Sequence, residues 1–118
     1  MSGLHALASQ AGVDVLRAAG SAADAAIATN AALAVPYAHM TRLGGDAFQL
    51  IYDARSGAGR CLDDGGRRPP VPALTGSRPL GYAEVPFRGV LPATLTAPGA
   101  VASWAEAHVS YGRLPLAL

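Results

Sequence analysis

Residues 22–35 constrain the fold of this chain more than any other segment, because they are almost wholly small and apolar. Ser21 precedes the segment as a helix N-cap, and Asp24 stands three residues later in a capping-box position. Pro36 ends it, since proline disfavours helical geometry in the residue before it. A helix without a polar face is normally covered on several sides. The sequence therefore predicts a central, buried helix whose alanines let neighbouring backbones come close.

Helices are also predicted on both sides of this segment. Over residues 6–19 apolar side chains recur at helical spacing, and Gly20 follows where a left-handed C-terminal cap is favoured. Over residues 100–111 the same spacing returns, and Gly112 stands just past the end. The predicted apolar faces are Leu7, Ala8, Ala11, Val15 and Ala18 in the first helix, and Val101, Trp104, Ala105 and His108 in the last.

A β-hairpin is predicted between the second and third helices. Residues 47–52 (AFQLIY) are short, aromatic and β-branched, which is typical of a buried strand, and residues 60–63 follow after a turn rich in Gly, Asp and Ser. Residues 90–97 are a candidate for a further short strand. The order of elements indicates an α+β fold, with an antiparallel sheet covered by helices on one face. We expect residues 1–118 to form a single partial domain.

Composition excludes several classes of function. Of 118 residues, 51% are hydrophobic and 14% charged, a low charge that suggests a missing partner surface, although a compact alanine-rich domain is the alternative. The nine basic residues, all arginine, are scattered, which argues against nucleic-acid binding. His5, His39 and His108 lack metal-ligand spacing, so neither a metal nor another cofactor is expected. Cys61, the single cysteine, excludes an intrachain disulfide and is expected to be an inert core residue rather than a reactive thiol.

Targeting signals are not visible in the sequence. Residues 1–7 lack a basic stretch followed by an apolar run, so no signal peptide is expected. The most apolar segment, 22–35, is too short to span a bilayer and contains Asp24 and Asn30. These features give a cytoplasmic location only by default. The apolar residues at 113–118 are unusual for a natural C-terminus, so truncation is an expectation.

Four segments resemble the gamma-glutamyltranspeptidase family, in the same order along the chain. They are residues 5–26 (HALASQAGVDVLRAAGSAADAA), 39–48 (HMTRLGGDAF), 97–104 (APGAVASW) and 111–115 (YGRLP). The resemblance implies an N-terminal-nucleophile hydrolase with an αββα sandwich, of which this chain is the start of the large subunit. Such enzymes are made as precursors that cleave themselves into a large and a small subunit.

The resemblance also implies a mechanism. The new N-terminal threonine of the small subunit attacks a gamma-glutamyl or related amide, such as glutathione, with its own α-amine as base. An oxyanion hole stabilises the intermediate, and water or an acceptor amine resolves the acyl-enzyme. The threonines of this chain do not match the processing site, so no catalytic residue is expected here and the chain alone should be inactive. These threonines are Thr29, Thr41, Thr75, Thr94 and Thr96.

One substrate-binding residue of the family falls within the chain. Typical members have an arginine after the second strand that binds the α-carboxylate of the glutamyl group, and its planar fork suits a carboxylate. The matching position here is Gly65, while arginines follow at Arg67 and Arg68. Arg67 is therefore the candidate substrate contact; the alternative is a structural pairing with Asp63 or Asp64. A divergent substrate, another acyl amide, remains open.

Other readings of the chain are weaker. The pair Asp63-Asp64 is predicted to be structural, because adjacent strand residues point to opposite faces. The Gly44-Gly45-Asp46 run is predicted to be a tight turn into a strand rather than a phosphate loop. His39 is expected to be solvated. As a different class of function, the chain would be a non-catalytic interaction domain or the product of a decayed gene.

Overall fold

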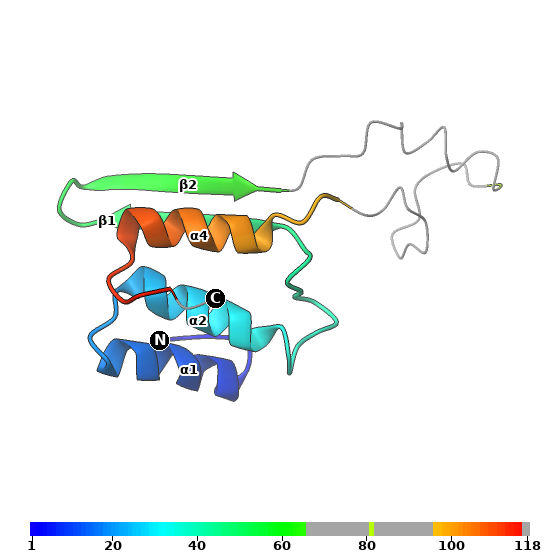
Figure 1. Ribbon diagram of the computed structural model, residues 1–118, viewed down its shortest axis with the longest axis horizontal. Coiled ribbons are helices and arrows are strands. Elements are labelled where there is room, and N and C mark those ends of the chain that lie inside the picture. Colours follow the sequence, from blue (N-terminus) through cyan, green and yellow to red (C-terminus); the bar gives the residue numbers. More distant parts are fainter. Residues whose placement is uncertain (66–80, 82–95, 117–118) are drawn as a thin grey trace.

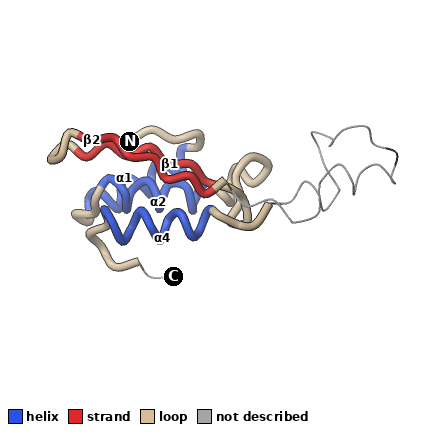
Figure 2. The backbone as a smooth tube through the Cα atoms, turned by 90° about the horizontal axis from the view of Figure 1, so that it is seen from above, coloured by secondary structure: helices blue, strands red, loops and turns tan. Residues whose placement is uncertain are grey.

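The computed structural model describes residues 1–65, 81 and 96–116, and these form helices packed on one face of a β-hairpin. The elements are α1 (Ala6–Arg17), α2 (Ala22–Leu33), β1 (Ala47–Asp53), β2 (Ala58–Asp64) and α4 (Ala100–Tyr111). Helix α4 packs against both strands of the hairpin, α2 lies beside α4 and sends Ile27 into the shared core, and α1 packs on the far side of α2 (Figures 1 and 2). The predicted α+β class is confirmed. The candidate strand at 90–97 falls largely outside the described residues.

Helix α2 begins at the predicted capping box. The Ser21 side chain accepts from Asp24 N at 3.1 Å, and Asp24 Oδ2 accepts from Ser21 N at 2.8 Å. The α-helix ends at Leu33, two residues earlier than predicted, and the next residues form turns that leave Val35 82% exposed. The last turn tightens before Pro36: Ala34 N is shared by Asn30 O and Ala31 O at 3.3 Å each, and Val35 N donates to Ala32 O at 3.2 Å.

Helix α1 ends in a Schellman motif whose left-handed residue is alanine. Gly20 N donates to Val15 O at 2.9 Å and Ala19 N to Leu16 O at 3.1 Å, as this motif requires. The positive φ falls on Ala19, at 65°, so the prediction that Gly20 supplies the left-handed cap is wrong. Gly20 is buried instead, and a Cβ there would lie 2.6 Å from Val15 Cγ1.

The buried face of α1 also differs from the predicted one. Ala8 and Gly12 are buried, whereas Leu7 is 69% exposed and Ala18 is exposed. The reason is close helix packing: a side chain at Gly12 would collide with Thr29 of α2. The seam between the two helices is therefore made by the smallest residues, and the larger apolar ones lie beside it.

The hairpin pairs β1 with β2 in antiparallel register, with Ala47 opposite Asp64 and Asp53 opposite Ala58. Its inner face carries Ile51 and Leu62, which pack on the core. The outer face is exposed and apolar, so the prediction that β1 is buried holds for one face only. Exposed on this outer face are Phe48 (70%), Leu50 (85%), Tyr52 (70%) and, from β2, Cys61. The expectation that Cys61 is a core residue is wrong, because its register places it opposite Leu50.

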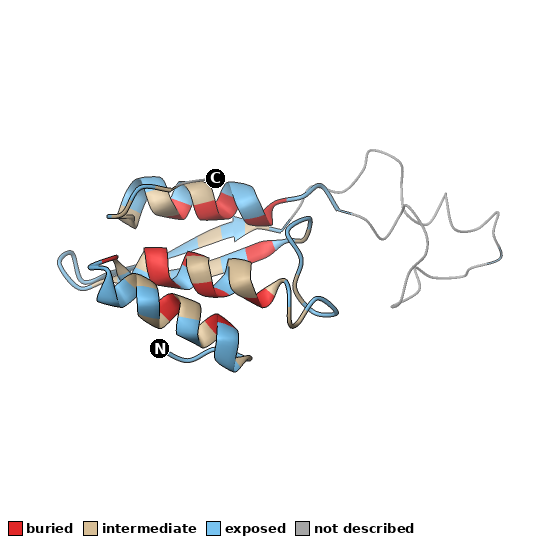
Figure 3. Cartoon of the chain, turned by 60° about the horizontal axis from the view of Figure 1, so that its bottom comes forward, coloured by how far each residue is buried: buried red, intermediate tan, exposed pale blue. Residues whose placement is uncertain are grey.

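The core lies where α2, α4 and the hairpin meet. It consists of Ile27, Ala47, Ala100, Trp104 and Ala107, all at most 8% exposed. Figure 3 shows the buried stripes of the helices turned toward one another. Since most of these residues are alanine, Trp104 supplies the largest apolar side chain of this cluster.

The buried face of α4 is turned by one residue from the predicted one. It consists of Ala100, Ser103, Trp104 and Ala107, while Val101 is 38% exposed. Ser103 explains the rotation, because its hydroxyl lies on the buried side and accepts from Gln49 Nε2 of β1 at 2.7 Å. Gly112 is the C-cap as predicted. None of the described helices is both long and apolar enough to cross a membrane.

Candidate functional site

Two of the four family-like segments, 39–48 and 97–104, meet at the end of the molecule where β2 finishes and α4 begins (right in Figure 1). Gly45 O accepts from Gly99 N at 3.0 Å and from Ala100 N at 2.9 Å, and so satisfies free amides in the first turn of α4. Thr96 Oγ1 donates to Asp46 Oδ1 at 2.6 Å. These bonds join the loop before β1 to the segment that leads into α4.

The end of β2 is held against the same segment by a glycine. A Cβ at Gly99 would collide with the carbonyl of Asp64, so the two backbones approach closer than any side chain allows. The contact leaves Asp63 exposed and Asp64 half-buried, as expected for strand neighbours on opposite faces. Asp63 and Asp64 thus lie on opposite faces of β2, as the alternation of strand side chains predicts.

Gly65, the position that matches the family's arginine, is closed off by its neighbours. Its amide donates to Asp63 Oδ1 at 3.0 Å, and a Cβ there would lie 2.8 Å from Phe48 Cζ and 3.0 Å from that oxygen. A side chain at this position would push the Phe48 ring aside. Arg67 and its alternative pairing with Asp63 or Asp64 lie outside the described residues, so the role of Arg67 stays a prediction.

Two open hollows flank the junction. One, of about 410 Å³, lies between the end of β2 and residues 97–102, and the other, of about 420 Å³, between the ends of α2 and β1. Arg42 and Asp46 line the second hollow and bring one positive and one negative side chain to it. The first hollow is lined in part by Gly65, the last described residue before residues 66–80.

The remaining candidate residues are placed as follows. His39 is exposed, as expected, with its ring 4.3 Å from that of Tyr37. The Gly44-Gly45-Asp46 run leads directly into β1, which agrees with a turn rather than a phosphate loop. Among the described residues no group of three or more His, Cys, Asp or Glu side chains could hold a metal ion.

The opposite end of the helices is organised by Asp24, whose wider role the sequence analysis missed. The carboxylate is 8% exposed, and Oδ2 accepts not only from Ser21 but also from Arg113 N at 2.9 Å and Leu114 N at 3.2 Å. His108 Nε2 donates to Leu114 O at 2.6 Å and lies 3.7 Å from Asp24 Oδ1. The signal in the sequence was an acidic residue within an otherwise apolar, buried helix.

Two opposing effects set the ionisation of Asp24. Burial raises the pKa of the carboxyl, but hydrogen bonds from the Ser21, Arg113 and Leu114 amides lower it, and the net pKa lies below its usual value. Asp24 is therefore ionised at neutral pH. A charged acceptor holds segment 112–116 against the start of α2.

Taken together, three helices on an antiparallel hairpin, with glycine-rich turns at one end, define one helical layer and one sheet of an N-terminal-nucleophile hydrolase fold. The chain shares this arrangement with cephalosporin acylase from Bacillus halodurans: the TM-score is 0.80 and the identity 43%, over 93% of this chain and 20% of that one. The predicted fold family is confirmed.

The sequence comparisons agree. The family model described as Gamma-glutamyltranspeptidase matches residues 8–118, so the chain belongs to that family. It is 42% identical over 113 residues to the glutathione hydrolase-like YwrD proenzyme of Bacillus subtilis, covering 96% of this chain and 21% of the relative. It is 41% identical over 103 residues to the oxamate amidohydrolase proenzyme of Klebsiella pneumoniae, covering 87% and 19%. The chain thus spans about a fifth of the length of these relatives.

Proposed function

We propose that this chain is the N-terminal part of the large subunit of an amidohydrolase or acyltransferase that works through an acyl-enzyme. The nucleophilic threonine and the small subunit that carries it lie in the remainder of the enzyme, which self-cleaves from a precursor. The observation that supports this role is the junction of loop 41–46, the end of β2 and the start of α4. Two segments that resemble the family, 39–48 and 97–104, meet there, next to Gly65, the position that the resemblance matches to the family's substrate arginine.

The substrate class follows from the chemistry of an arginine beside this junction. An arginine fork favours a carboxylate close to the amide that is cleaved. Because the matching position is Gly65, which has no side chain, we assign carboxylate binding to Arg67, two residues further along. The relatives are named for glutathione, oxamate and cephalosporin, so the body of the acyl group varies among them. We propose a carboxylate-bearing acyl amide, with a gamma-glutamyl amide as the first substrate to test.

A chimaera tests this proposal. Residues 1–118 replace the equivalent N-terminal fifth of the YwrD proenzyme, to which they are 42% identical. We expect the chimaera to cleave itself into two subunits and to release product from a gamma-glutamyl anilide. The isolated chain should release none. A folded chimaera that neither matures nor turns over substrate, while the parent enzyme does both, would contradict the proposed role.

In the same chimaera, Arg67→Ala tests the substrate contact. Loss of a charge-assisted hydrogen bond worth about 1.5–3 kcal/mol should raise KM roughly 10- to 100-fold with little change in kcat. Arg60→Ala is the matched control, since Arg60 lies in β2 near the hairpin turn. An unchanged KM in a normally matured Arg67→Ala chimaera would leave Arg67 structural and would not affect the assignment of the enzyme class.

A further inference from the structure

The ring of Phe48 lies between the residues that line the two hollows at the junction of β2 with α4. Phe48 itself lines the second hollow, between the ends of α2 and β1. The edge of its ring lies against Gly65, which lines the first hollow: a Cβ at Gly65 would be 2.8 Å from Phe48 Cζ and 3.1 Å from Cε1. One aromatic side chain therefore stands at the centre of the candidate site, next to the point from which the chain continues toward Arg67.

This ring is open to solvent, with Phe48 70% exposed, whereas the preceding Ala47 is 8% exposed in the core. The alternation of β1 places Phe48 on the outer face of the hairpin together with Leu50 and Tyr52, which are 85% and 70% exposed. Those two residues line neither hollow at the junction. Covering apolar surface is favourable by about 25 cal/mol per Å², so an apolar part of a ligand in either hollow is stabilised by contact with the Phe48 ring.

The charges nearest to the ring along the hairpin are carboxylates that already accept hydrogen bonds. Asp63 is paired with Phe48 across the hairpin, and its Oδ1 accepts from Gly65 N at 3.0 Å. Asp46, two residues before Phe48, accepts from a threonine hydroxyl at 2.6 Å. A ligand carboxylate on the ring would meet both negative groups, and like charges repel. Arg42 lines the second hollow from the loop before β1. The ring therefore suits an uncharged, apolar part of a ligand rather than its carboxylate.

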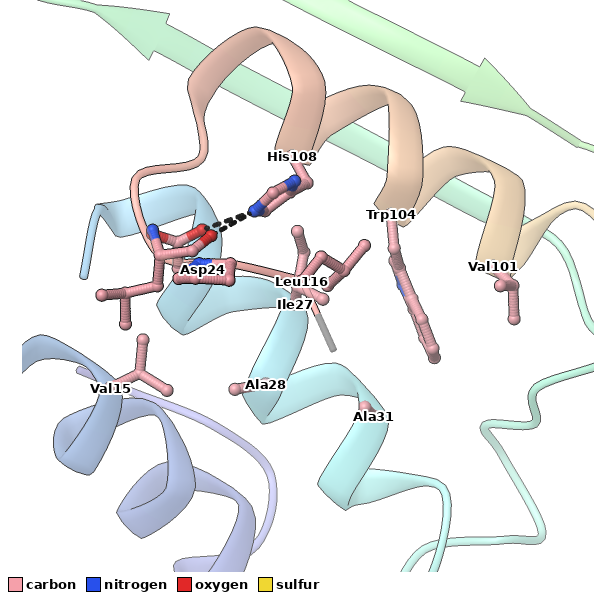
Figure 4. A pocket seen from close by; sticks show the side chains of 11 residues that line it. Val15, Asp24, Ile27, Ala28, Ala31, Val101, Trp104, His108 and Leu116 are labelled. Carbon is pink, nitrogen blue, oxygen red and sulfur yellow. Dashed lines mark hydrogen bonds and ion pairs between the residues drawn. The ribbon is translucent and has the colours of Figure 1, made fainter. Parts of the chain in front are cut away.

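The cavity between α2 and α4 does not share this position. It has a volume of about 330 Å³, and Figure 4 shows Trp104 and Val101 of α4 along it, with Asp24 and His108 turned toward each other at one end. Asp24 Oδ1 lies 3.7 Å from His108 Nε2, so the charged side chain of this cavity already faces a partner. None of the described residues that line it belongs to the hairpin or to loop 41–46. Only the hollows at the junction are next to Phe48.

We propose, on the basis of the function proposed above, that Phe48 is a specificity-determining residue whose ring contacts an aromatic group on the acyl part of the substrate. Two aromatic rings gain free energy beyond the area that they bury when they meet offset or edge to face. The preferred substrate is then an acyl amide that carries both a carboxylate, for Arg67, and an aryl group, for Phe48. The aryl group distinguishes it from a plain gamma-glutamyl amide.

A matched pair of substrates tests this preference in the chimaera with the YwrD proenzyme. One is a gamma-glutamyl anilide, and the other is the same compound with a phenyl group on C3 of the glutamyl chain. We expect kcat/KM to be at least about 10-fold higher for the phenyl compound, as one buried aromatic contact provides. Equal or lower values in a chimaera that matures normally would overturn the inference alone. A chimaera that does not mature would contradict the proposed function and, with it, the role of Phe48.

Three variants of the matured chimaera locate the preference. Phe48→Ala should lower kcat/KM mainly for the phenyl compound and remove the preference, whereas Phe48→Tyr keeps a ring and should retain it. Tyr52→Ala is the matched control, since Tyr52 is an equally exposed aromatic residue on the same face but lies opposite Gly59, near the hairpin turn. It should leave the preference unchanged. If Phe48→Ala lowered kcat/KM equally for both substrates, or if the preference survived it, Phe48 would not determine specificity.

Discussion

The two ends of the helical layer are closed by different kinds of contact. At the junction of β2 with α4, backbone meets backbone: Gly45 O accepts two amides, and Gly99 lies against the Asp64 carbonyl. At the other end a single buried side chain, Asp24, accepts from the amide of Ser21 and from the amides of Arg113 and Leu114, which lie 89 and 90 residues further along the chain. The first end has no room for a Cβ at Gly99, and the second end depends on the negative charge of Asp24.

This difference has a physical cause. Backbone groups are present at every position, so a backbone junction needs only the right turns and an absence of Cβ atoms. A carboxylate can accept several hydrogen bonds at once. It can therefore join two segments that do not pair through secondary structure. Its contribution disappears when it is removed or protonated. The two ends should respond differently to substitution and to pH.

Removal of the Asp24 carboxylate should have the largest effect. Asp24→Ala leaves the partly buried amides of Arg113 and Leu114 without their acceptor and removes the capping box. We expect a loss of about 3–5 kcal/mol in the free energy of unfolding, measured by urea denaturation. Asp14→Ala on the surface of α1 is the control and should change it by less than about 0.5 kcal/mol. A loss below about 1 kcal/mol for Asp24→Ala would show that segment 112–116 is held by other contacts.

Added volume at the backbone junction should have the next largest effect. In Gly99→Ala the new Cβ meets the carbonyl of Asp64, and the end of β2 must move away from α4. Overpacking of this kind costs about 1–3 kcal/mol. Gly44→Ala, in the same loop region but with open space around its Cα, is the control. If both variants have the same midpoint of urea denaturation, the close approach does not contribute to stability.

Lowering the pH should weaken the Asp24 end but not the junction of β2 with α4. The pKa of Asp24 in the folded chain lies below its usual value, so its stabilisation is fully present above that usual value and is lost as the pH falls toward the folded pKa. We expect the difference in thermal midpoint between the wild-type chain and Asp24→Ala to shrink below about pH 4. The difference between the wild-type chain and Gly99→Ala should stay constant. If both differences in thermal midpoint shrank equally as the pH fell, the Asp24 end would be no more sensitive to acid than the Gly99 junction.

The smallest effect is expected at the end of α1, where the chain turns toward Asp24. Ala19 holds a φ of 65°, which costs an L-residue about 1 kcal/mol relative to glycine. Ala19→Gly should therefore stabilise the chain by about 0.5–1 kcal/mol in urea denaturation. Ala18→Gly, just before it with a φ of −79°, should be destabilising instead. Equal effects of the two substitutions would mean that the strain at Ala19 is relieved by its surroundings.

Local patterns predicted the elements well. The capping box at Ser21, the hairpin and the third helix all follow from residues within a few positions of one another, which is why their order and approximate bounds could be derived. The faces were harder to predict. Ser103 is buried because it meets Gln49, which lies 54 residues away, and Gly12 is buried because it meets Thr29 across a helix seam. Neither contact has a signature within its own helix.

The candidate site shows the same division. The motifs at 39–48, 97–104 and 111–115 are readable along the chain, but their grouping at opposite ends of the helices is not. The sequence by itself determined the helices, the hairpin and the family, because capping, periodicity and motif spacing are local or recur among relatives. Only the tertiary structure decided that Asp24 holds the segment after α4, and that Gly65 lies against the ring of Phe48. Those properties depend on distances between residues far apart in the chain, which are fixed by packing of the whole layer.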